Sequence, residues 1–228
     1  MKNANLLDQF FLIDSQICEE LIGLLDLGEK DTLVEIGAGD GKLTKELVKK
    51  EAKIIAVEID KRFSKDLEEI SGNLQVIFAD ALEVVQNKKK YPISFNKITG
   101  SLPSSIVEPV MHLLLKIDFD LAVFILPLKF AYKLSDHEIF SLYLESEIIK
   151  PVSRKSFLPI PKTNWALVKS VKKPNALKAG DQERFLKQYV YEHPLAEKPN
   201  ALREGLIKYY RSQGKKLTKN EARKLLAI

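Results

Sequence analysis

The stretch Glu35-Ile36-Gly37-Ala38-Gly39-Asp40-Gly41 follows directly on the apolar run Thr32-Leu33-Val34. A strand that feeds a glycine-rich turn brings backbone N–H groups and a helix N-terminus close to a ligand, because glycine has no Cβ to block the approach. An acidic residue closes each of the next two predicted strands, at Glu58 and near Asp80. In a doubly wound sheet such a carboxylate can bind ribose hydroxyls. The sequence therefore predicts an α/β fold and a cofactor that contains a nucleoside.

Length and composition are those of one large domain, or of a domain with a small addition. Of the 228 residues 45% are hydrophobic, and the single cysteine, Cys18, excludes an internal disulfide. One cysteine with three histidines cannot supply a repeated zinc-ligand pattern. The first residues carry acid and amide side chains where a signal peptide needs an apolar stretch, and no later apolar run reaches membrane-spanning length. We expect a reduced, cytoplasmic protein without a metal ion, a signal peptide or a membrane span.

Charge is unevenly distributed along the chain. Residues 1–149 hold 17 Lys and Arg against 25 Asp and Glu, a net charge of −8, whereas residues 150–228 hold 19 against 6, a net charge of +13. A solvated lysine-rich surface that keeps the protein soluble is one explanation. So concentrated an excess of positive charge favours the other explanation, which is binding to a polyanion such as nucleic acid.

Five short apolar runs rich in β-branched and aromatic residues predict buried strands. These runs cover 33–36, 54–58, 74–78, 95–99 and 121–126. Helical patterns lie between or after them, at 42–50, 62–70 and 107–116. This alternation predicts a parallel sheet with helices on both faces. An earlier amphipathic helix over 15–25 places Cys18 on its apolar stripe, which predicts a thiol packed in the core.

The pattern changes after Leu134. It predicts a strand over 141–149, a proline-rich stretch over 157–161, a strand over 165–171 and a linker over 174–180. The remainder predicts helices over 182–191, over 200–212 and from Thr218, where the Thr-x-x-Glu221 spacing is that of a capping box. The predicted organisation is an α/β domain over residues 1–173 and a small basic helical domain over residues 174–228.

The spacing of the glycine turn favours one class of cofactor. Dinucleotide-binding dehydrogenases carry G-x-G-x-x-G, whereas this turn reads G-x-G-x-G at Gly37, Gly39 and Gly41. S-adenosylmethionine presents an amino-acid moiety to such a turn and needs no third glycine for a pyrophosphate. Asp80 with Ala81 suits a hydrogen bond to the exocyclic amine of adenine. Taken singly, an acid at Glu58 or Asp80 can instead cap a helix, and a dehydrogenase is a distant alternative.

The turn Gly100-Ser101-Leu102-Pro103-Ser104 follows the fourth predicted strand, beside the cofactor crevice of an open α/β sheet. An aromatic amine is a poor nucleophile because its lone pair is delocalised into the ring. An enzyme that methylates one therefore places acceptors against the amine hydrogens. A polar side chain and backbone carbonyls in a proline-stiffened turn supply such acceptors. The alternative is an ordinary turn in which Ser104 or Ser105 is the N-cap of a helix that begins near Ile106.

Together these residues resemble the KsgA/Erm family of S-adenosylmethionine-dependent rRNA adenine N6 dimethyltransferases, over almost the whole chain. Gln9-Phe-Phe-Leu-Ile-Asp14 is similar to the family's Q-N/H-F-L-x-D segment. Phe157-Leu-Pro-Ile-Pro-Lys162, followed by Trp165-Ala-Leu-Val168, is similar to its F-x-P-x-P-K-V-x-S-x-V-V segment. The helical tail resembles the small rRNA-binding domain of the family in a shortened form.

The resemblance implies a Rossmann-like class I methyltransferase sheet with a small C-terminal helical domain. It implies that S-adenosylmethionine is bound by Gln9, Phe10, Leu12, Gly37, Gly39, Gly41, Glu58, Asp80, Ala81 and Ser101. It implies a catalytic group made of Ser101, Leu102, Pro103 and Ser104, with Phe157 offering an aromatic face. The implied partner is small-subunit rRNA or an immature small ribosomal subunit, with no membrane and with the protein acting as a cytoplasmic monomer.

The catalytic motif departs from the family pattern, which is N-L-P-Y or N-L-P-F where this chain has Ser101-Leu102-Pro103-Ser104. The Ser101 hydroxyl can still accept a hydrogen bond from the target amine, but the aromatic ring after the proline is missing. Base flipping costs a few kcal/mol and aromatic stacking returns roughly 1–3 kcal/mol. A second hypothesis is therefore a catalytically silent relative that binds rRNA as an assembly factor. A methyltransferase with another target amine, such as cytosine N4 or a protein, is a third.

Overall fold

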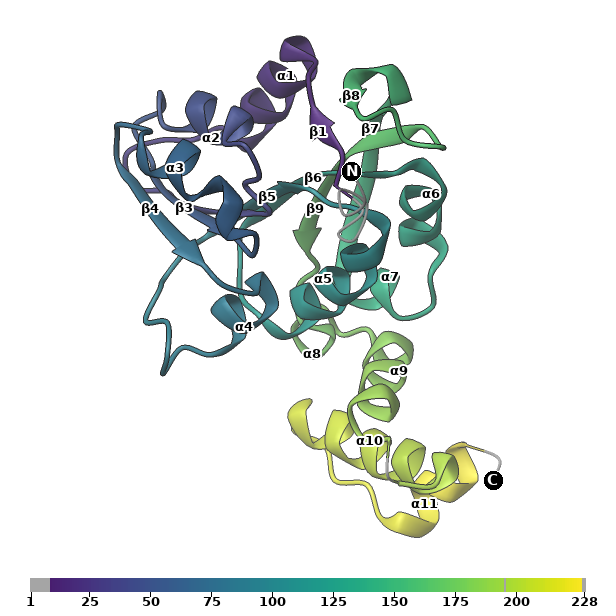
Figure 1. The fold of residues 1–228 in the computed structure, drawn as a ribbon. Helices are drawn as coiled ribbons and strands as arrows, with labels where there is room; N and C mark the ends of the chain where they lie inside the picture. Colours follow the sequence, from purple (N-terminus) through teal and green to yellow (C-terminus); the bar gives the residue numbers. More distant parts are fainter. Residues whose placement is uncertain (1–8, 195, 227–228) are drawn as a thin grey trace. The chain divides into compact units, whose positions relative to one another are not determined.

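The computed structural model describes residues 9–194 and 196–226 (Figure 1). They form two compact units. The first unit comprises the residues up to Asp136 together with Leu144–Lys172, and the second comprises His137–Tyr143 together with the residues from Lys173 onward. The domain boundary proposed from the sequence assigns 137–143 to the first domain, whereas the contacts of this short segment group it with the second unit.

A seven-stranded sheet forms the centre of the first unit, in the order β4-β3-β2-β5-β6-β9-β7. Its parallel strands are β2 (Thr32–Ile36), β3 (Lys53–Glu58), β4 (Leu74–Phe78), β5 (Lys97–Ser101) and β6 (Leu121–Pro127). Strand β9 (Trp165–Lys172) is antiparallel both to β6 and to β7 (Leu144–Val152). The prediction of a Rossmann-like parallel sheet is confirmed.

Helices cover the sheet on both sides, as Figure 1 shows. On one side α1 (Ser15–Leu25) packs on α2 (Lys42–Leu47), and on the other α4 (Ala81–Gln86) packs on α5 (Ser104–Lys116). The turn η1 (Lys61–Phe63) and α3 (Ser64–Glu68) lead from β3 to β4, and α6 (Leu128–Asp136) packs against β7 and β9. Cys18 lies on the buried face of α1, where burial raises the pKa of its thiol to about 11. The predicted core thiol is therefore confirmed.

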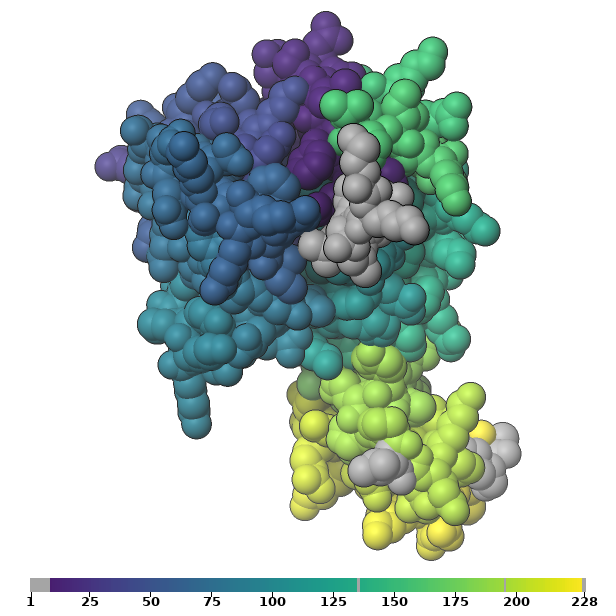
Figure 2. Space-filling model, in the orientation of Figure 1, coloured from purple at the N-terminus to yellow at the C-terminus, as the bar shows by residue number. Residues whose placement is uncertain are grey.

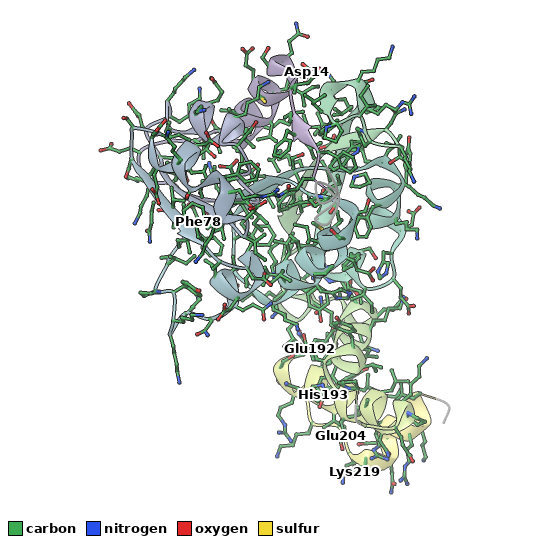
Figure 3. The ribbon with its side chains drawn as sticks, viewed as in Figure 1. Asp14, Phe78, Glu192, His193, Glu204 and Lys219 are labelled. Carbon is green, nitrogen blue, oxygen red and sulfur yellow. The ribbon has the colours of Figure 1, made fainter. Side chains whose placement is uncertain are left out.

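A short antiparallel pair ties the N-terminal segment to the loop after β7. Strand β1 (Phe11–Leu12) pairs with β8 (Phe157–Leu158), which follows the turn η2 (Arg154–Ser156). In the space-filling view the purple N-terminal residues lie against the green residues of this loop (Figure 2). Asp14 caps α1 and also accepts a hydrogen bond of 2.8 Å from the Ser156 hydroxyl (Figure 3). The segment Gln9–Asp14 is thereby fixed at one end of the sheet.

The second unit is helical. Its elements are α7 (Phe140–Tyr143), α8 (Ala176–Ala179), α9 (Gln182–Glu192), α10 (Lys198–Ser212) and α11 (Lys219–Leu225). Ala176, Phe185 and Tyr209 form its small core. Thr218 and Glu221 form the reciprocal hydrogen bonds of a capping box at the start of α11, which confirms that prediction.

Two predicted elements differ from the structure. The strand predicted over 141–149 begins only at Leu144, because Phe140–Tyr143 is helical and the His137 ring accepts from the backbone N–H of Ile139 at 3.3 Å. The predicted linker over 174–180 contains α8, which Asn175 caps and which ends at Gly180 with φ of 70°. Both errors concern single turns of helix, which are too short to show a helical apolar stripe in the sequence.

Two classes of feature are absent from the described ranges. None of the helices within residues 9–194 and 196–226 combines the length and the apolar character that crossing a bilayer requires. In the same ranges no three His, Cys, Asp or Glu side chains gather in a way that could hold a metal ion.

Candidate functional site

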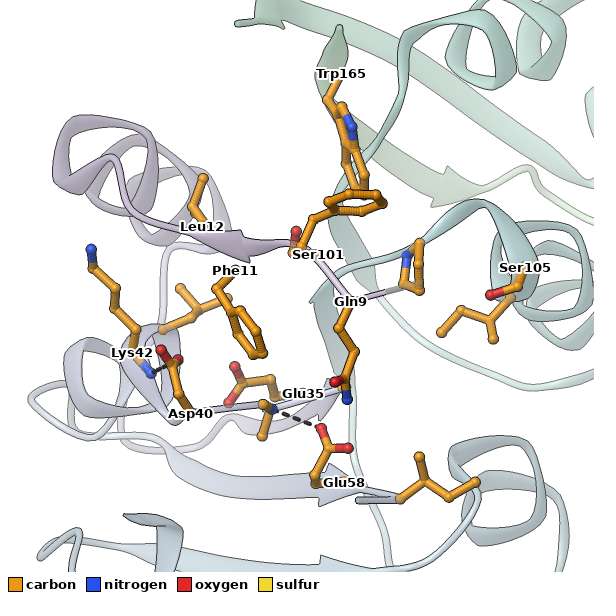
Figure 4. Close-up of a pocket in the computed structure, with 18 residues that line it drawn as sticks. Gln9, Phe11, Leu12, Glu35, Asp40, Lys42, Glu58, Ser101, Ser105 and Trp165 are labelled. Atoms are coloured by element: carbon orange, nitrogen blue, oxygen red, sulfur yellow. Dashed lines mark hydrogen bonds between the residues drawn. The ribbon is translucent and has the colours of Figure 1, made fainter. Parts of the chain in front are cut away.

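A cavity of about 420 Å³ lies at the carboxyl end of the parallel strands (Figure 4). It is lined by the N-terminal segment, the turn from β2 to α2, the end of β3, the turn after β5 and the first residue of β9. Eight of the residues predicted for the site line it: Gln9, Phe10, Leu12, Gly37, Gly39, Glu58, Ser101 and Pro103. The structure therefore brings together residues that lie far apart in the sequence.

The register of the sheet explains why these side chains meet. Paired residues of neighbouring strands point to the same face, and so do residues two apart in one strand. Glu35 is paired with Ala56 and Thr99, so Glu58 and Ser101, each two residues further on, point to the same face as Glu35. The pairs Ser101↔Ile125 and Pro127↔Trp165 extend this face to Trp165. One face of the sheet thus carries the polar groups of the cavity.

The glycine turn lies close to the N-terminal segment and to β3. Gly37, Gly39 and Gly41 have left-handed φ angles of 74°, 55° and 77°. A Cβ added to Gly39 would lie 3.2 Å from the Phe11 ring, and one added to Gly41 would lie 2.7 Å from Ile70. Gly39 therefore keeps the turn open to the cavity, whereas Gly41, which does not line the cavity, is required for packing.

Glu58 connects this turn to the end of β3. Its side chain lies in the cavity wall with 4% of the residue exposed. One carboxylate oxygen accepts from the Gly39 N–H at 2.7 Å, which Figure 4 shows as a dashed line, and the other accepts from the Asp60 N–H at 2.8 Å. Because a carboxylate oxygen can accept two hydrogen bonds, both oxygens keep an acceptor position for a ligand.

Gln9 is anchored to the same end of β3. Its amide donates to Asp60 at 3.3 Å and accepts from Arg62 at 3.4 Å. The hydrogen bonds from the Arg62 guanidinium lower the pKa of the Asp60 carboxyl to about 2. Asp60 is therefore ionised and paired at neutral pH, and the position of Gln9 is fixed.

Glu35 has a different environment on the same face. It is 1% exposed, and burial raises the pKa of its carboxyl to about 8, although the Thr44 hydroxyl donates to it at 2.6 Å. At neutral pH the Glu35 carboxyl is therefore mainly protonated. It is a neutral polar group in the cavity wall that the sequence-based interpretation left out.

The turn after β5 is held by the backbone. A Cβ on Gly100 would lie 2.5 Å from the Ile36 carbonyl, so only glycine fits between β5 and β2. The Leu102 N–H donates to the Ile125 carbonyl at 2.9 Å, and the Leu102 side chain is buried outside the cavity. Helix α5 begins at Ser104 with Pro103 as its N-cap and without a side-chain cap. The alternative in which Ser104 or Ser105 caps the helix is therefore wrong.

Two polar atoms in the cavity-lining residues have no partner. The Ser101 Oγ and the Trp165 Nε1 are both buried, and neither makes a hydrogen bond with any part of the chain that the structure describes. Leaving a buried donor or acceptor unpaired costs roughly 1–3 kcal/mol. Such atoms are rare in native proteins, and each calls for an explanation such as a bound water, an ion or a catalytic role.

Comparison with known proteins identifies the family. Residues 1–226 match the family model described as ribosomal RNA adenine dimethylase.

The chain belongs to the ribosomal RNA adenine dimethylase family.

Relatives whose name is probable ribosomal RNA small subunit methyltransferase A are consistent with this family. A probable ribosomal RNA small subunit methyltransferase A from Methanosarcina barkeri is 32% identical over 192 residues, which are 78% of this chain and 65% of the relative, slightly under two thirds of its length. A protein of the same name from Methanococcus maripaludis strain C7 is 31% identical over 85% of this chain and 78% of its own. The one from Thermococcus gammatolerans is 34% identical over 87% and 73%.

Solved structures share the dimethylase fold. A dimethyladenosine transferase from Plasmodium falciparum superposes with a TM-score of 0.67 at 22% identity, over 95% of this chain and 87% of that one. The 23S rRNA methyltransferase ErmE superposes with a TM-score of 0.66 at 22% identity, over 89% and 86%. These likenesses show a common methyltransferase architecture.

Four further residues predicted for the dimethylase site lie outside the cavity. Asp80 is exposed and caps α4 through a 2.8 Å bond from the Leu82 N–H, with Ala81 next to it. Ser104 is exposed and lines a separate hollow of about 280 Å³. Phe157 is fully buried in β8, opposite Leu12. Phe157 does not present an open ring face to the cavity in this structure.

Other cavity residues were missed from the sequence. The most informative are Phe11, Glu35, Lys42, Ser105 and Trp165. Glu35 stands inside the stretch that predicted the fold, and its position before the glycine turn was a usable signal. Trp165 stands where the family segment F-x-P-x-P-K-V-x-S has its serine. That replacement of a small side chain by the single tryptophan was a second signal.

Proposed function

We propose that this protein is an S-adenosylmethionine-dependent methyltransferase that adds one or two methyl groups to adenine N6 of small-subunit rRNA, during ribosome assembly. The observation that carries the proposal is one cavity lined by both the Gly37–Gly39 turn with Glu58 and the Ser101–Pro103 turn. The family and the names of its relatives favour an active enzyme over a catalytically silent assembly factor.

The residues of the cavity fit S-adenosylmethionine. A volume of about 420 Å³ suits a ligand of this size. The methionine moiety would lie along Gly37 and Gly39, where no Cβ intervenes, and the ribose hydroxyls would donate to the open acceptor positions of Glu58. Phe10 and Leu12 would supply apolar contact. The adenine would extend toward Asp80 and Ala81, which follow β4, the strand paired with β3.

When bound, S-adenosylmethionine supplies an electrophilic methyl group. The Ser101 hydroxyl would accept a hydrogen bond from one hydrogen of the target amine, and the Leu102 carbonyl would accept from the other. These acceptors favour a tetrahedral nitrogen whose lone pair points at the methyl carbon. The backbone bond from Leu102 to Ile125 holds the turn in place. After transfer the extra proton on N6 leaves to water, so the reaction needs no general base.

Basic residues of both units support binding to rRNA. Residues 150–172 contain six Lys and Arg and no Asp or Glu. Three of these cations, Arg154, Lys155 and Lys162, are exposed near β8. The rest of the excess of Lys and Arg over Asp and Glu lies in residues 173–228, which belong to the helical unit. Cations of this density would neutralise RNA phosphates and release counterions.

The test is methyl transfer to immature small subunits, followed by digestion to nucleosides and mass spectrometry. Calorimetry with S-adenosylmethionine is run on the same protein. We expect cofactor binding together with N6-methyladenosine or N6,N6-dimethyladenosine. Cofactor or RNA binding without a methylated product would support the silent assembly factor and overturn the proposal. N4-methylcytidine, or methyl groups on protein, would point to another target amine.

A further inference from the structure

Two unpaired polar atoms belong to neighbouring parts of one sheet face. Ser101 ends β5 and Trp165 begins β9, and β6 lies between these strands. Because β9 is antiparallel to β6, its first residue lies at the same end of the sheet as the last residue of β5. Both side chains line the cavity, and in Figure 4 both lie on its upper side while Glu58 lies at the bottom.

The two atoms are chemically complementary. The indole N–H of Trp165 can only donate a hydrogen bond, and the Ser101 hydroxyl can accept one. A partner that satisfies both must offer an acceptor to the indole N–H and a donor to the hydroxyl. The Watson–Crick edge of adenine does so, with the N1 acceptor next to the N6 amine. Guanine and uracil offer a ring N–H where adenine has N1, so two donors would meet at Trp165.

We infer that Trp165 is a specificity-determining residue, whose indole N–H donates to N1 of the flipped target adenine while the Ser101 hydroxyl accepts from its N6 amine. The inference rests on the proposed function. Flipped bases are read by hydrogen bonds to this edge. The pair therefore supplies a donor and an acceptor that would favour adenine over guanine and uracil, whereas cytosine, with N3 beside its N4 amine, presents the same pattern as adenine.

Packing holds the indole in one orientation. Phe157 lies 4.7 Å from Trp165 between ring centroids with an interplanar angle of 35°, and Phe10 meets its edge at 6.1 Å and 75°. Trp165 is 1% exposed, and its backbone is paired with Pro127 of β6. These contacts fix the orientation of the ring, and because Nε1 itself is buried, the entering base has to displace the atoms that cover it. Phe157 thus acts here as a positioning residue behind the indole.

The experiment uses the fact that Trp165 is the only tryptophan. In ¹⁵N-labelled full-length protein its indole N–H gives a single resonance, which is followed with S-adenosylhomocysteine present during titration with AMP, 7-deaza-AMP, 1-deaza-AMP and UMP. We expect AMP and 7-deaza-AMP to shift the indole proton downfield, and 1-deaza-AMP and UMP to leave it in place. An indole resonance that stays fixed while the backbone amides of Ser101, Leu102 and Ser105 respond to AMP would overturn the inference. So would an equal response to 1-deaza-AMP.

A second measurement decides the matter if free nucleotides bind too weakly. Trp165→Phe keeps an aromatic ring in the core and removes the N–H, and its melting temperature checks the fold. We expect kcat/KM for small-subunit RNA to fall about tenfold, while the dissociation constant of S-adenosylmethionine changes less than twofold. Tyr91→Phe, which removes a polar atom from a ring outside the cavity, is the matched control and keeps full activity.

The outcomes separate the two proposals. An unchanged kcat/KM in a folded Trp165→Phe protein overturns the role of Trp165 and leaves the methyltransferase in place. A wild-type protein that methylates no adenine overturns the proposed function instead. In that case the indole titration with AMP still reports whether the cavity recognises the adenine edge.

Discussion

The two sides of the cavity differ in how their polar groups are paired. On the side of β3, both oxygens of Glu58 accept backbone N–H groups, and Asp60 is paired with Arg62 and Gln9. On the side of β5 and β9, the Ser101 hydroxyl and the Trp165 indole N–H have no partner among the described residues. On the first side the polar groups already have partners in the protein and Glu58 keeps further acceptor positions, whereas on the second side a ligand would supply the first partner.

This difference indicates a division of roles. Paired groups hold a fixed shape, which suits a cofactor that binds the same way in every turnover. An unpaired buried group forms its first hydrogen bond when its partner binds. The free energy of that bond therefore appears only in the complex with the target base. We therefore expect substitutions on the paired side to weaken cofactor binding, and substitutions on the unpaired side to slow methyl transfer.

Ser101→Ala gives the largest expected effect. Removing one positioned hydrogen-bonding group at a reacting centre typically lowers kcat by about 100-fold. We expect a loss of this order for transfer to small-subunit RNA, with the dissociation constant of S-adenosylmethionine changed less than threefold. Single-turnover kinetics and calorimetry on the same preparation measure the two quantities.

The control for this prediction is Ser71→Ala, which removes an exposed hydroxyl outside the cavity. A Ser101→Ala protein with wild-type kcat would show that the unpaired hydroxyl has no part in transfer. A loss confined to cofactor affinity would assign Ser101 to the paired side and remove the distinction between the two sides.

Glu58→Gln tests the paired side. The amide keeps one acceptor oxygen, so the N–H of Gly39 or of Asp60 loses its partner. A hydrogen bond to a charged group contributes about 1.5–3 kcal/mol, and we expect the affinity for S-adenosylmethionine to fall at least tenfold. At saturating cofactor the rate of transfer should stay within a few-fold of wild type. A fall in the saturated rate with unchanged affinity would contradict the assignment.

Charge reversal tests whether the RNA-binding surface extends from the unpaired side of the cavity to the residues around β8. Arg154→Glu with Lys155→Glu changes two exposed cations next to β8. We expect a weaker affinity for small-subunit RNA and a shallower dependence on salt, by about one unit of log–log slope for each lost phosphate contact. The matched control, Lys88→Glu with Lys89→Glu, makes the same change of charge in an exposed loop after α4. Equal losses in the two double variants would mean that only the net charge matters.

The sequence predicted the paired side better than the unpaired side. Strand ends, glycines and acids recur in a fixed order, so Gly37, Gly39 and Glu58 could be assigned to the site before their contacts were known. Glu58 accepts from the N–H of Asp60, two residues further on, and from the N–H of Gly39, which stands in the glycine turn of the neighbouring strand. Most elements of the sheet followed in the same way from apolar runs.

The unpaired side of the cavity depends on contacts between residues that lie far apart in the sequence. Trp165 reaches the cavity only because β9 runs antiparallel beside β6, and no periodicity in the chain states that pairing. Phe157 matched a family segment, yet its pairing with Leu12 buries the ring. Asp80 matched as well, and in the structure it caps a helix that the apolar pattern was too short to predict.

Glu35 sharpens the comparison with the smallest expected effect on transfer, because its carboxyl is strongly desolvated and, among the described residues, accepts its hydrogen bond from Thr44. Its pKa is raised to about 8 in the folded protein, from a value of 4.5 for an unperturbed group. Between these two pH values the unfolded chain has lost the proton that the folded protein keeps, so raising the pH favours unfolding. The slope is at most about 1.4 kcal/mol per pH unit for one proton.

Glu35→Gln removes the ionisable group and keeps a polar side chain of the same shape. We expect wild-type melting temperatures to decline from pH 5 to pH 8 more steeply than those of the variant, with transfer rates at pH 7 within a few-fold of each other. Parallel pH slopes would mean that Glu35 is already ionised in the folded protein. Binding of S-adenosylmethionine adds a test, because its positive charge favours the carboxylate and lowers this pKa. Calorimetry at pH 7 in buffers of different ionisation enthalpy should therefore detect proton release in the wild type and none in the variant.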